Sequence, residues 1–171
     1  MLSFLDTAYF DDVRRDKAVT PAPGFDMVVV DAAGAVVALL GTEIADGVAT
    51  IDTVAVHPDH RRHGLARRLL ERACAEAAAR GTTTIEAWTR DDPGTLAWYR
   101  AMGFTDVDHY LHVYANYYTD AGEPDRAVAG PVPGLRPVGL FLHAGLDDEV
   151  RLRAEFRRVH VCRRFTKPLQ A

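Results

Sequence analysis

Val54-Ala55-Val56-His57-Pro58-Asp59-His60-Arg61-Arg62-His63-Gly64-Leu65-Ala66-Arg67-Arg68-Leu69-Leu70 is the stretch of sequence that decides the fold. A β-type run ends here at a Pro-Asp turn, and a basic, glycine-bearing loop leads into a long helix. This layout brings unpaired backbone N–H groups and the positive end of a helix dipole to one point in space. The stretch therefore predicts a site for an anion such as a pyrophosphate.

The glycine-bearing loop has the residue types that close approach of an anion requires. Gly64 has no Cβ and tolerates a positive φ, and Ala66 adds only a methyl group. Arginine side chains beside these amides can add charge-assisted hydrogen bonds. A second interpretation is that Gly64 is an ordinary turn residue and that the arginines solvate a helix end. The residues expected to surround the anion are Arg61, Arg62, His63, Gly64, Leu65, Ala66 and Arg67.

Composition is typical of a soluble globular domain. The chain has 171 residues, is 48% hydrophobic and 26% charged, and carries a net charge of -4. These values suit one folded domain and give no support for a nucleic-acid or anionic-membrane partner. The two cysteines, Cys74 and Cys162, are not clustered and indicate neither a zinc site nor a disulfide framework. Because we find no signal peptide and no apolar run of the roughly 20 residues that a membrane helix needs, we expect a cytoplasmic protein.

Hydrophobic periodicity and turn signals predict a mixed α/β sheet. Asp31–Gly34 and Asp46–Gly47 are typical of hairpin turns, so three antiparallel strands are expected before the loop. Apolar residues at 65, 69, 70, 73 and 77 mark one face of a helix that Gly81 ends. The predicted strands are 25–30, 35–43, 48–56, 82–88, 104–114 and 159–165, with a short apolar run at 139–143. The predicted helices are 65–80, 91–102 and 147–158, with a loosely helical segment at 2–17 and a long surface connection at 119–139.

A second motif, Leu96-Ala97-Trp98-Tyr99-Arg100-Ala101-Met102-Gly103-Phe104, follows the strand predicted at 82–88. Arg61-x-x-Gly64-x-Ala66 resembles the acetyl-CoA signature of the GNAT acetyltransferase superfamily. The second motif resembles that family's Ala-x-x-Tyr-x-x-x-Gly-Phe helix end, and both occur in the order that the family uses. The resemblance covers about residues 26–115. It implies one GNAT-like domain over 1–171, with a parallel strand pair around the loop and with 116–171 completing the sheet.

The resemblance assigns chemical roles to two side chains. Tyr99 matches a tyrosine that can protonate the departing coenzyme thiolate, and its alternative role is packing between helix and sheet. Asp52 matches a strand acid that can take the proton of the acceptor ammonium. A partner arginine is the alternative reason for an acid inside an apolar strand. Glu43, at the end of the preceding strand, is a weaker competitor for the role of base.

Three further residues are expected to contact the coenzyme. The backbone groups of Val54 and Val56 match those with which family members hold the pantetheine arm as an extra strand. Asp92 stands where many relatives have an asparagine that contacts this arm. An ionised aspartate accepts hydrogen bonds but does not donate them, so Asp92 is also interpreted as a cap of the helix that begins at Pro93.

The chain departs from the family at both ends. The family's fold begins with a strand and two helices, whereas this sequence offers only one helix-like segment before its first hairpin. The segment from about 116 to 158 is longer than the usual connection before the last strand. Our hypothesis is that this segment covers the acceptor side, in its own subunit or in a neighbour's.

The resemblance implies transfer of acetyl from acetyl-CoA to a small or peptidyl primary amine. Direct transfer in a ternary complex is expected, because no cysteine lies at the predicted centre. We expect no metal, since His57, His60 and His63 crowd one turn without an acid set. A homodimer is the self-association that we consider. Two rival functions stay open: a sensor that binds acyl-CoA without turnover, and a nucleic-acid-binding protein that uses the basic series at 151–164, which interspersed acids disfavour.

Overall fold

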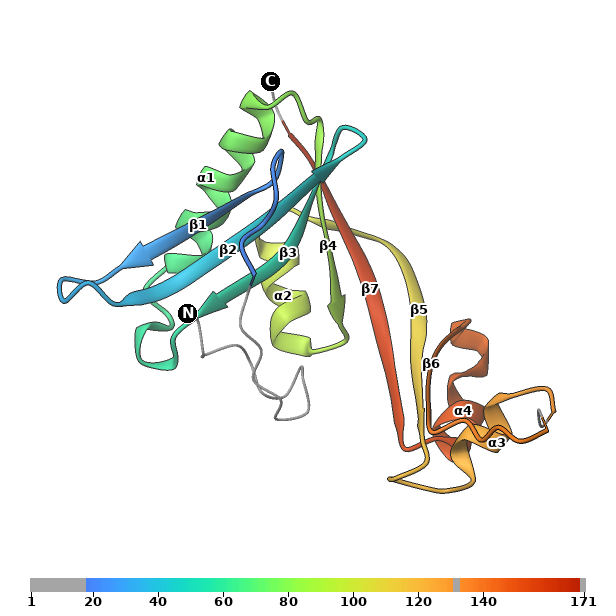
Figure 1. Ribbon diagram of the computed structural model, residues 1–171. Helices are drawn as coiled ribbons and strands as arrows, with labels where there is room; N and C mark the ends of the chain where they lie inside the picture. Colours follow the sequence, from blue (N-terminus) through green and yellow to red (C-terminus); the bar gives the residue numbers. More distant parts are fainter. Residues whose placement is uncertain (1–17, 131–132, 170–171) are drawn as a thin grey trace. The chain divides into compact units, whose positions relative to one another are not determined.

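The structure is a computed structural model that describes residues 18–130 and 133–169. Its strands are β1 (Phe25–Val30), β2 (Val36–Ala45), β3 (Val48–Val56), β4 (Thr84–Arg90), β5 (Thr105–Asn116), β6 (Gly139–Ala144) and β7 (Arg158–Pro168). Its helices are α1 (Leu65–Ala79), α2 (Pro93–Ala101), α3 (Glu123–Ala127) and α4 (Glu149–Glu155), with the 3-10 turns η1 (Pro58–His60) and η2 (Leu146–Asp148). The strands form a mixed sheet in the order β1-β2-β3-β4-β7-β5-β6 (Figure 1).

The chain divides into two compact units, which are described separately. Unit 1 comprises residues 1–88, 97–106 and 165–171, and unit 2 comprises residues 89–96 and 107–164. The predicted helical segment at 2–17 lies outside the described residues. None of the helices in the described ranges has both the length and the apolar character needed to span a bilayer.

Unit 1 confirms the predicted antiparallel meander. β1 pairs with β2 and β2 pairs with β3, each antiparallel. The first hairpin turn closes with a hydrogen bond from the backbone N–H of Gly34 to the carbonyl of Asp31 (3.1 Å). In the second turn, Asp46 and Gly47 both have positive φ, at 50° and 75°, which is the conformation that two-residue hairpins favour.

Helix α1 packs its predicted apolar face against β1, β2 and β3. Leu69, Leu70, Ala73 and Ala77 are its buried residues, as the periodicity predicts. The helix ends at Ala79, and Gly81, the residue after the C-cap Arg80, has a φ of +82°, the left-handed conformation that favours glycine at this position. β4 then pairs parallel to β3, as expected for a strand–helix–strand crossover.

Unit 2 holds a second hydrophobic core on one face of β5, β6 and β7. Leu111, Val113, Leu152, Val159 and Val161 are buried in it, together with Ala115 and Phe156. The sequence prediction differs from the structure here in two places. Residues 119–139 contain the short helix α3, and the helix predicted at 147–158 is a 3-10 turn followed by the shorter α4.

A buried carboxylate explains why α3 forms within this connection. The side chain of Glu123 is 1% exposed. Its two oxygens accept the backbone N–H of Asn116 (3.0 Å) and of Arg157 (2.6 Å). Buried carboxylates need such partners, so Glu123 connects the end of β5 to the residue before β7. Because Arg157 is distant in sequence from Glu123, hydrophobic periodicity does not reveal this contact or the helix α3.

Candidate functional site

The loop before α1 has the geometry that the sequence predicts for an anion site. Gly64 has a φ of +74°, and no atom of the residues that the structure describes lies within 4 Å of the position that a Cβ would occupy. Arg62 also has a positive φ, at 65°. Two left-handed residues close together curl the backbone tightly, and the described residues leave the side-chain position of Gly64 open.

Backbone N–H groups at the start of α1 point out of the helix. The first intrahelical hydrogen bond runs from the N–H of Arg68 to the carbonyl of Gly64 (3.0 Å). The helical ladder therefore uses none of the N–H groups of Leu65, Ala66 and Arg67. Gly64 supplies no side-chain cap. These donors and the helix dipole together favour a negatively charged group at this point.

The cationic side chains of the loop have different partners. Arg61 donates from Nε to the carbonyl of Val56 (3.4 Å), which holds the loop against the end of β3. Arg67 pairs with Glu71 one turn along the helix (2.8 Å). Arg62 and His63 are exposed, and the Nδ1 of His63 lies 3.2 Å from the carbonyl oxygen of His60. All of these residues border the loop, but the charge of Arg67 is partly neutralised by its ion pair with Glu71.

His57 has a structural role that the sequence analysis did not predict. Its Nδ1 accepts the backbone N–H of Asp59 (3.3 Å) and so caps the turn η1. The His-Pro-Asp sequence was the available signal. Among the described residues, no three His, Cys, Asp or Glu side chains are arranged to hold a metal ion.

β3 continues past the end of its pairing with the parallel strand β4, and this last part of β3 leads into the loop before α1. The parallel ladder between β3 and β4 runs from the pair Val48/Thr84 to the pair Ile51/Ala87. β3 continues to Val56 and stays paired with β2 on its other side. Val54 and Val56 therefore lie past the end of the β3–β4 ladder, on a strand edge that an extended ligand can pair with.

Asp52 occupies a β-bulge at the same place. Ile51 faces Thr42 and Thr53 faces Gly41, so Asp52 is the extra residue between two pairs. Bulges re-aim a side chain and often lie next to active sites. The Asp52 side chain is exposed and accepts a hydrogen bond from the hydroxyl of Thr53 (2.9 Å). The structure thus places this carboxylate at the point where the ladder between the two parallel strands ends.

Two other carboxylates lie close by along the strands. Glu43 is exposed on β2 and faces Thr50 across the β2–β3 pair. Glu86 is half-buried on β4 and accepts a hydrogen bond from the Thr50 hydroxyl (3.2 Å). Sequence reasoning did not single out Glu86, although an acid among the alternating apolar residues of β4 was a visible signal.

Tyr99 is a buried residue of α2. Its ring stacks on Phe165 (5.3 Å, 15°) and meets Trp98 and Phe104 edge-on. Only 4% of its surface is exposed. The packing role considered for Tyr99 is therefore present, and its role as proton donor stays a prediction.

Asp92 caps α2. Its Oδ1 accepts the backbone N–H of Thr95 (2.7 Å), and this hydrogen bond is the main reason that the pKa of the Asp92 carboxyl is lowered. The capping interpretation is thus confirmed. A contact between Asp92 and a coenzyme stays a prediction.

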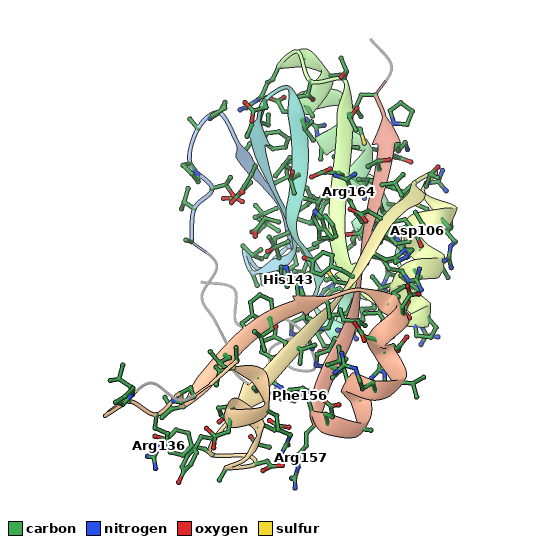
Figure 2. The ribbon with its side chains drawn as sticks, turned by 90° about the vertical axis from the view of Figure 1, so that its right-hand side faces the viewer. Asp106, Arg136, His143, Phe156, Arg157 and Arg164 are labelled. Atoms are coloured by element: carbon green, nitrogen blue, oxygen red, sulfur yellow. The ribbon has the colours of Figure 1, made fainter. Side chains whose placement is uncertain are left out.

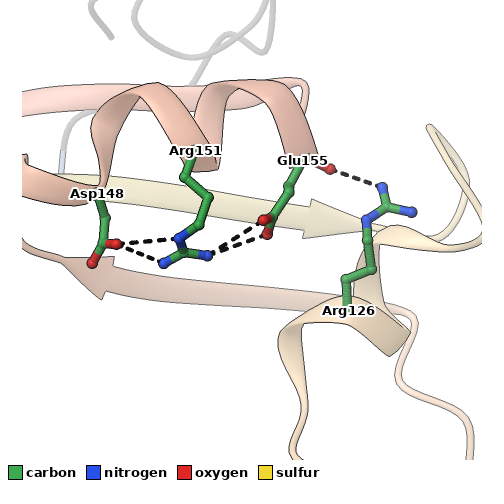
Figure 3. A network of polar contacts seen from close by, with 4 residues as sticks. All are labelled: Arg126, Asp148, Arg151 and Glu155. Atoms are coloured by element: carbon green, nitrogen blue, oxygen red, sulfur yellow. Dashed lines mark hydrogen bonds and ion pairs between the residues drawn. The ribbon is translucent and has the colours of Figure 1, made fainter.

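Three of the six arginines in the basic series at 151–164 form ion pairs with acids. Arg151 pairs with Asp148 (2.8 Å) and with Glu155 (3.3 Å), as Figure 3 shows. Arg153 pairs with Glu149 (2.8 Å). In addition, Arg163 pairs with Asp91 (2.6 Å). The ion pairs of these three arginines weaken the nucleic-acid interpretation.

The mixed sheet, with a left-handed glycine loop between a strand and a helix N-terminus, defines an α/β protein with a candidate site at that loop. The profile of the acetyltransferase (GNAT) family matches residues 3–104. The chain belongs to this family. The family match covers the loop, β3, β4 and Tyr99, and it ends before β5.

Individual relatives agree with this assignment. The chain is 32% identical over 102 residues to [ribosomal protein bS18]-alanine N-acetyltransferase of Escherichia coli. The aligned region covers 58% of this chain and 66% of the relative, just under two thirds of the relative's length. The crystal structure of the Escherichia coli enzyme of that name aligns over 89% of this chain and 73% of its own, with 18% identity and a TM-score of 0.55. A tandem GNAT protein from the clavulanic acid biosynthesis pathway aligns at 29% identity over 68% of this chain and 39% of its own, with a TM-score of 0.55.

Proposed function

We propose that this chain transfers acetyl from acetyl-CoA to a primary amine by direct transfer in a ternary complex. The observation that carries the proposal is the loop at Gly64, where outward N–H groups, a positive φ and open space coincide at a helix N-terminus. This arrangement suits the pyrophosphate of a coenzyme A ester. Val54 and Val56 offer backbone groups to the pantetheine arm along the free edge of β3.

Two side chains are proposed to move the protons of the reaction. The amine nitrogen attacks the thioester carbonyl, the new C–N bond forms and the C–S bond breaks. Asp52 first takes a proton from the acceptor ammonium, directly or through water, so that the neutral amine attacks. The nitrogen loses its second proton as the amide forms. Tyr99 supplies a proton to the departing thiolate. Glu43 stays the alternative base. Direct transfer forms no acetyl-enzyme intermediate, so no cysteine nucleophile is needed.

The terminal α-amine of a polypeptide is the acceptor that we favour among primary amines. The 32% identical relative is named for acetylating an alanine of ribosomal protein bS18. An α-amine also has an ordinary pKa near 8, about two units below that of a lysine ammonium. A larger fraction is therefore neutral at physiological pH, so a modest base such as an exposed carboxylate suffices.

Calorimetric titration with acetyl-CoA tests the coenzyme site. Gly64→Glu places a carboxylate where the pyrophosphate is expected, and we expect binding to be lost. Gly81→Glu is the matched control. Gly81 lies just past the other end of α1, with φ +82°, and nothing in the described part of the chain is within 4 Å of its Cβ position. Wild type and Gly81→Glu should bind alike. A folded wild type that binds no acetyl-CoA refutes the proposal.

Turnover separates an enzyme from a coenzyme sensor. Thiol release should be followed with an alanine-initiated peptide, the same peptide blocked at its terminus but carrying a lysine, and a polyamine. We expect the free peptide terminus to be the preferred acceptor. Tight acetyl-CoA binding without turnover on any amine would instead support the sensor.

A further inference from the structure

Strand β6 leaves one of its backbone edges uncovered by any strand of the described residues. It is the last strand in the sheet order, and it pairs with β5 along its whole length from Gly139 to Ala144. It lies outside residues 3–104, so the family match does not extend to it. An edge strand presents a row of N–H and C=O groups that can pair with another chain.

β6 also lacks the features that usually prevent such pairing. Its sequence, Gly-Leu-Phe-Leu-His-Ala, contains no acid, lysine, arginine or proline. The opposite edge of the sheet, β1, carries Asp26 and a register shift between Val29 and Val30. Charges and bulges on edge strands oppose strand addition. One edge of the sheet is thus protected in sequence and the other is not.

Apolar side chains gather beside this edge. Phe141 on β6 is 54% exposed, and Val138, just before the strand, is also exposed. The carbonyl of Val138 accepts the N–H of Tyr117, whose ring contacts that of the exposed Tyr118. Leu140 and Leu142 point the other way, into the core of unit 2. Exposed apolar groups next to an open strand edge are typical of an interaction surface.

Opposite charges flank the two ends of β6, and they indicate which partner can pair with the strand. Arg136 precedes the strand, stacks over the ring of Tyr117 (4.1 Å to the centroid) and is exposed. Asp147 follows the strand and is exposed. Figure 2 shows Arg136 beyond the start of β6 and His143 near its end. An antiparallel pairing of β6 with itself brings the basic end of one strand to the acidic end of the other, with no acid, lysine or arginine between them.

We propose that two copies of this chain pair through β6, antiparallel and around a two-fold axis near Phe141. The occupant is a second copy because a self-pairing makes the apolar centre around Phe141 meet itself and the opposite charges meet at both ends. The β5–β6 sheets of the two copies then join into one. Phe141 of one copy lies against Phe141 of the other, and the open backbone edge is satisfied.

Sedimentation velocity and light scattering across low to high micromolar protein test this interface. We expect a dimer for wild type. Phe141→Lys should raise the dimer dissociation constant by at least about tenfold, since a lysine on an edge opposes pairing. The matched control is Val150→Lys, which introduces the same charge at an apolar residue that is 86% exposed on α4. It should leave the dimer unchanged.

Charge reversal gives a second measurement that does not depend on Phe141. Arg136→Glu should weaken the dimer, and adding Asp147→Arg in the same chain should restore it. Hydrogen exchange should show the amides of β6 becoming more protected as protein concentration rises. A monomeric wild type at high micromolar concentration overturns the proposal. So does a dimer that Phe141→Lys and Val150→Lys affect equally, or that shows no added protection in β6.

Discussion

The ring of Tyr99 on α2 lies stacked on Phe165 of β7, with centroids 5.3 Å apart and planes 15° from parallel. The family motif thus packs against a strand that the chain reaches only at its far end. Tyr99→Phe keeps the ring and removes the hydroxyl. We expect the melting temperature to change little and kcat to fall by roughly 10²-fold or more, the range for removal of a general acid.

The control for Tyr99 is Phe165→Leu, which disturbs the stacking but keeps the hydroxyl. This variant should lower stability more than it lowers kcat. If Tyr99→Phe keeps full kcat, Tyr99 is a packing residue only.

Asp52→Asn tests the proposed base. We expect kcat to fall and acetyl-CoA affinity to stay the same, because Asp52 lies on the bulge of β3 and not in the anion loop. The remaining activity should rise with pH as the acceptor amine loses its proton in solution. Glu43→Gln is the comparison. A larger loss of kcat in Glu43→Gln than in Asp52→Asn would reassign the base.

Asp92 contributes stability as the cap of α2. Asp92→Ala should lower the free energy of unfolding by about 1 kcal/mol, since the N–H of Thr95 loses its acceptor. Because the folded pKa of this carboxyl is lowered, its contribution is present above the ordinary pKa and is lost as pH falls through the folded value. Chemical denaturation at neutral and acidic pH measures both effects.

Asp92→Asn separates the cap from a coenzyme contact. Asparagine caps as well as aspartate, so stability at neutral pH should be kept. An amide can also donate a hydrogen bond. Tighter acetyl-CoA binding by this variant would therefore indicate that residue 92 reaches the coenzyme arm, whereas unchanged binding would leave Asp92 as a cap alone.

Glu123→Ala should destabilise unit 2 strongly. Two backbone N–H groups, of Asn116 and Arg157, lose a charged acceptor inside the protein. We expect a loss of about 3 kcal/mol in the free energy of unfolding. Asp125→Ala, on the exposed side of the same helix, should have little effect. Equal changes in the two variants would show that the buried carboxylate has no special role.

His112 makes stability depend on pH. Burial, and then the charges of His143, Arg90 and His160, lower the pKa of its imidazole to about 4 from an ordinary value of 6.5. The unfolded chain therefore binds a proton between these two pH values when the folded chain does not. Stability should fall as pH decreases from 6.5 towards 4.

The comparison for this pH effect is His112→Asn, which removes the titrating group. Its stability should decrease less over the same pH interval. The proton of His112 would not be the cause if the two proteins lost stability in parallel.

Local signals in the sequence predicted much of unit 1 and of the candidate site. The turns at Asp31–Gly34 and Asp46–Gly47, the buried face of α1 and the left-handed Gly64 are all present in the structure. Each depends on residues that are close together in the chain, so turn chemistry and helical periodicity suffice to indicate them.

Features that depend on distant residues were not predicted. The bulge at Asp52 arises from the register between β2 and β3, and the sequence of β3 alone does not specify it. α3 forms because Glu123 meets the backbone of Arg157, far along the chain. In both cases the feature depends on a contact with a residue in another element, and the local sequence pattern does not show which residues will meet.

The sequence by itself determined the strand–loop–helix unit around Gly64, because a positive φ, a helix start and an apolar stripe are encoded within one short stretch. Only the tertiary structure decided that β7, the last strand in the chain, lies between β4 and β5, and that β6 is left at the edge. Strand order depends on which hydrophobic faces can be buried together. That choice is made by the whole chain, and hydrogen bonds between strands carry no sequence code of their own.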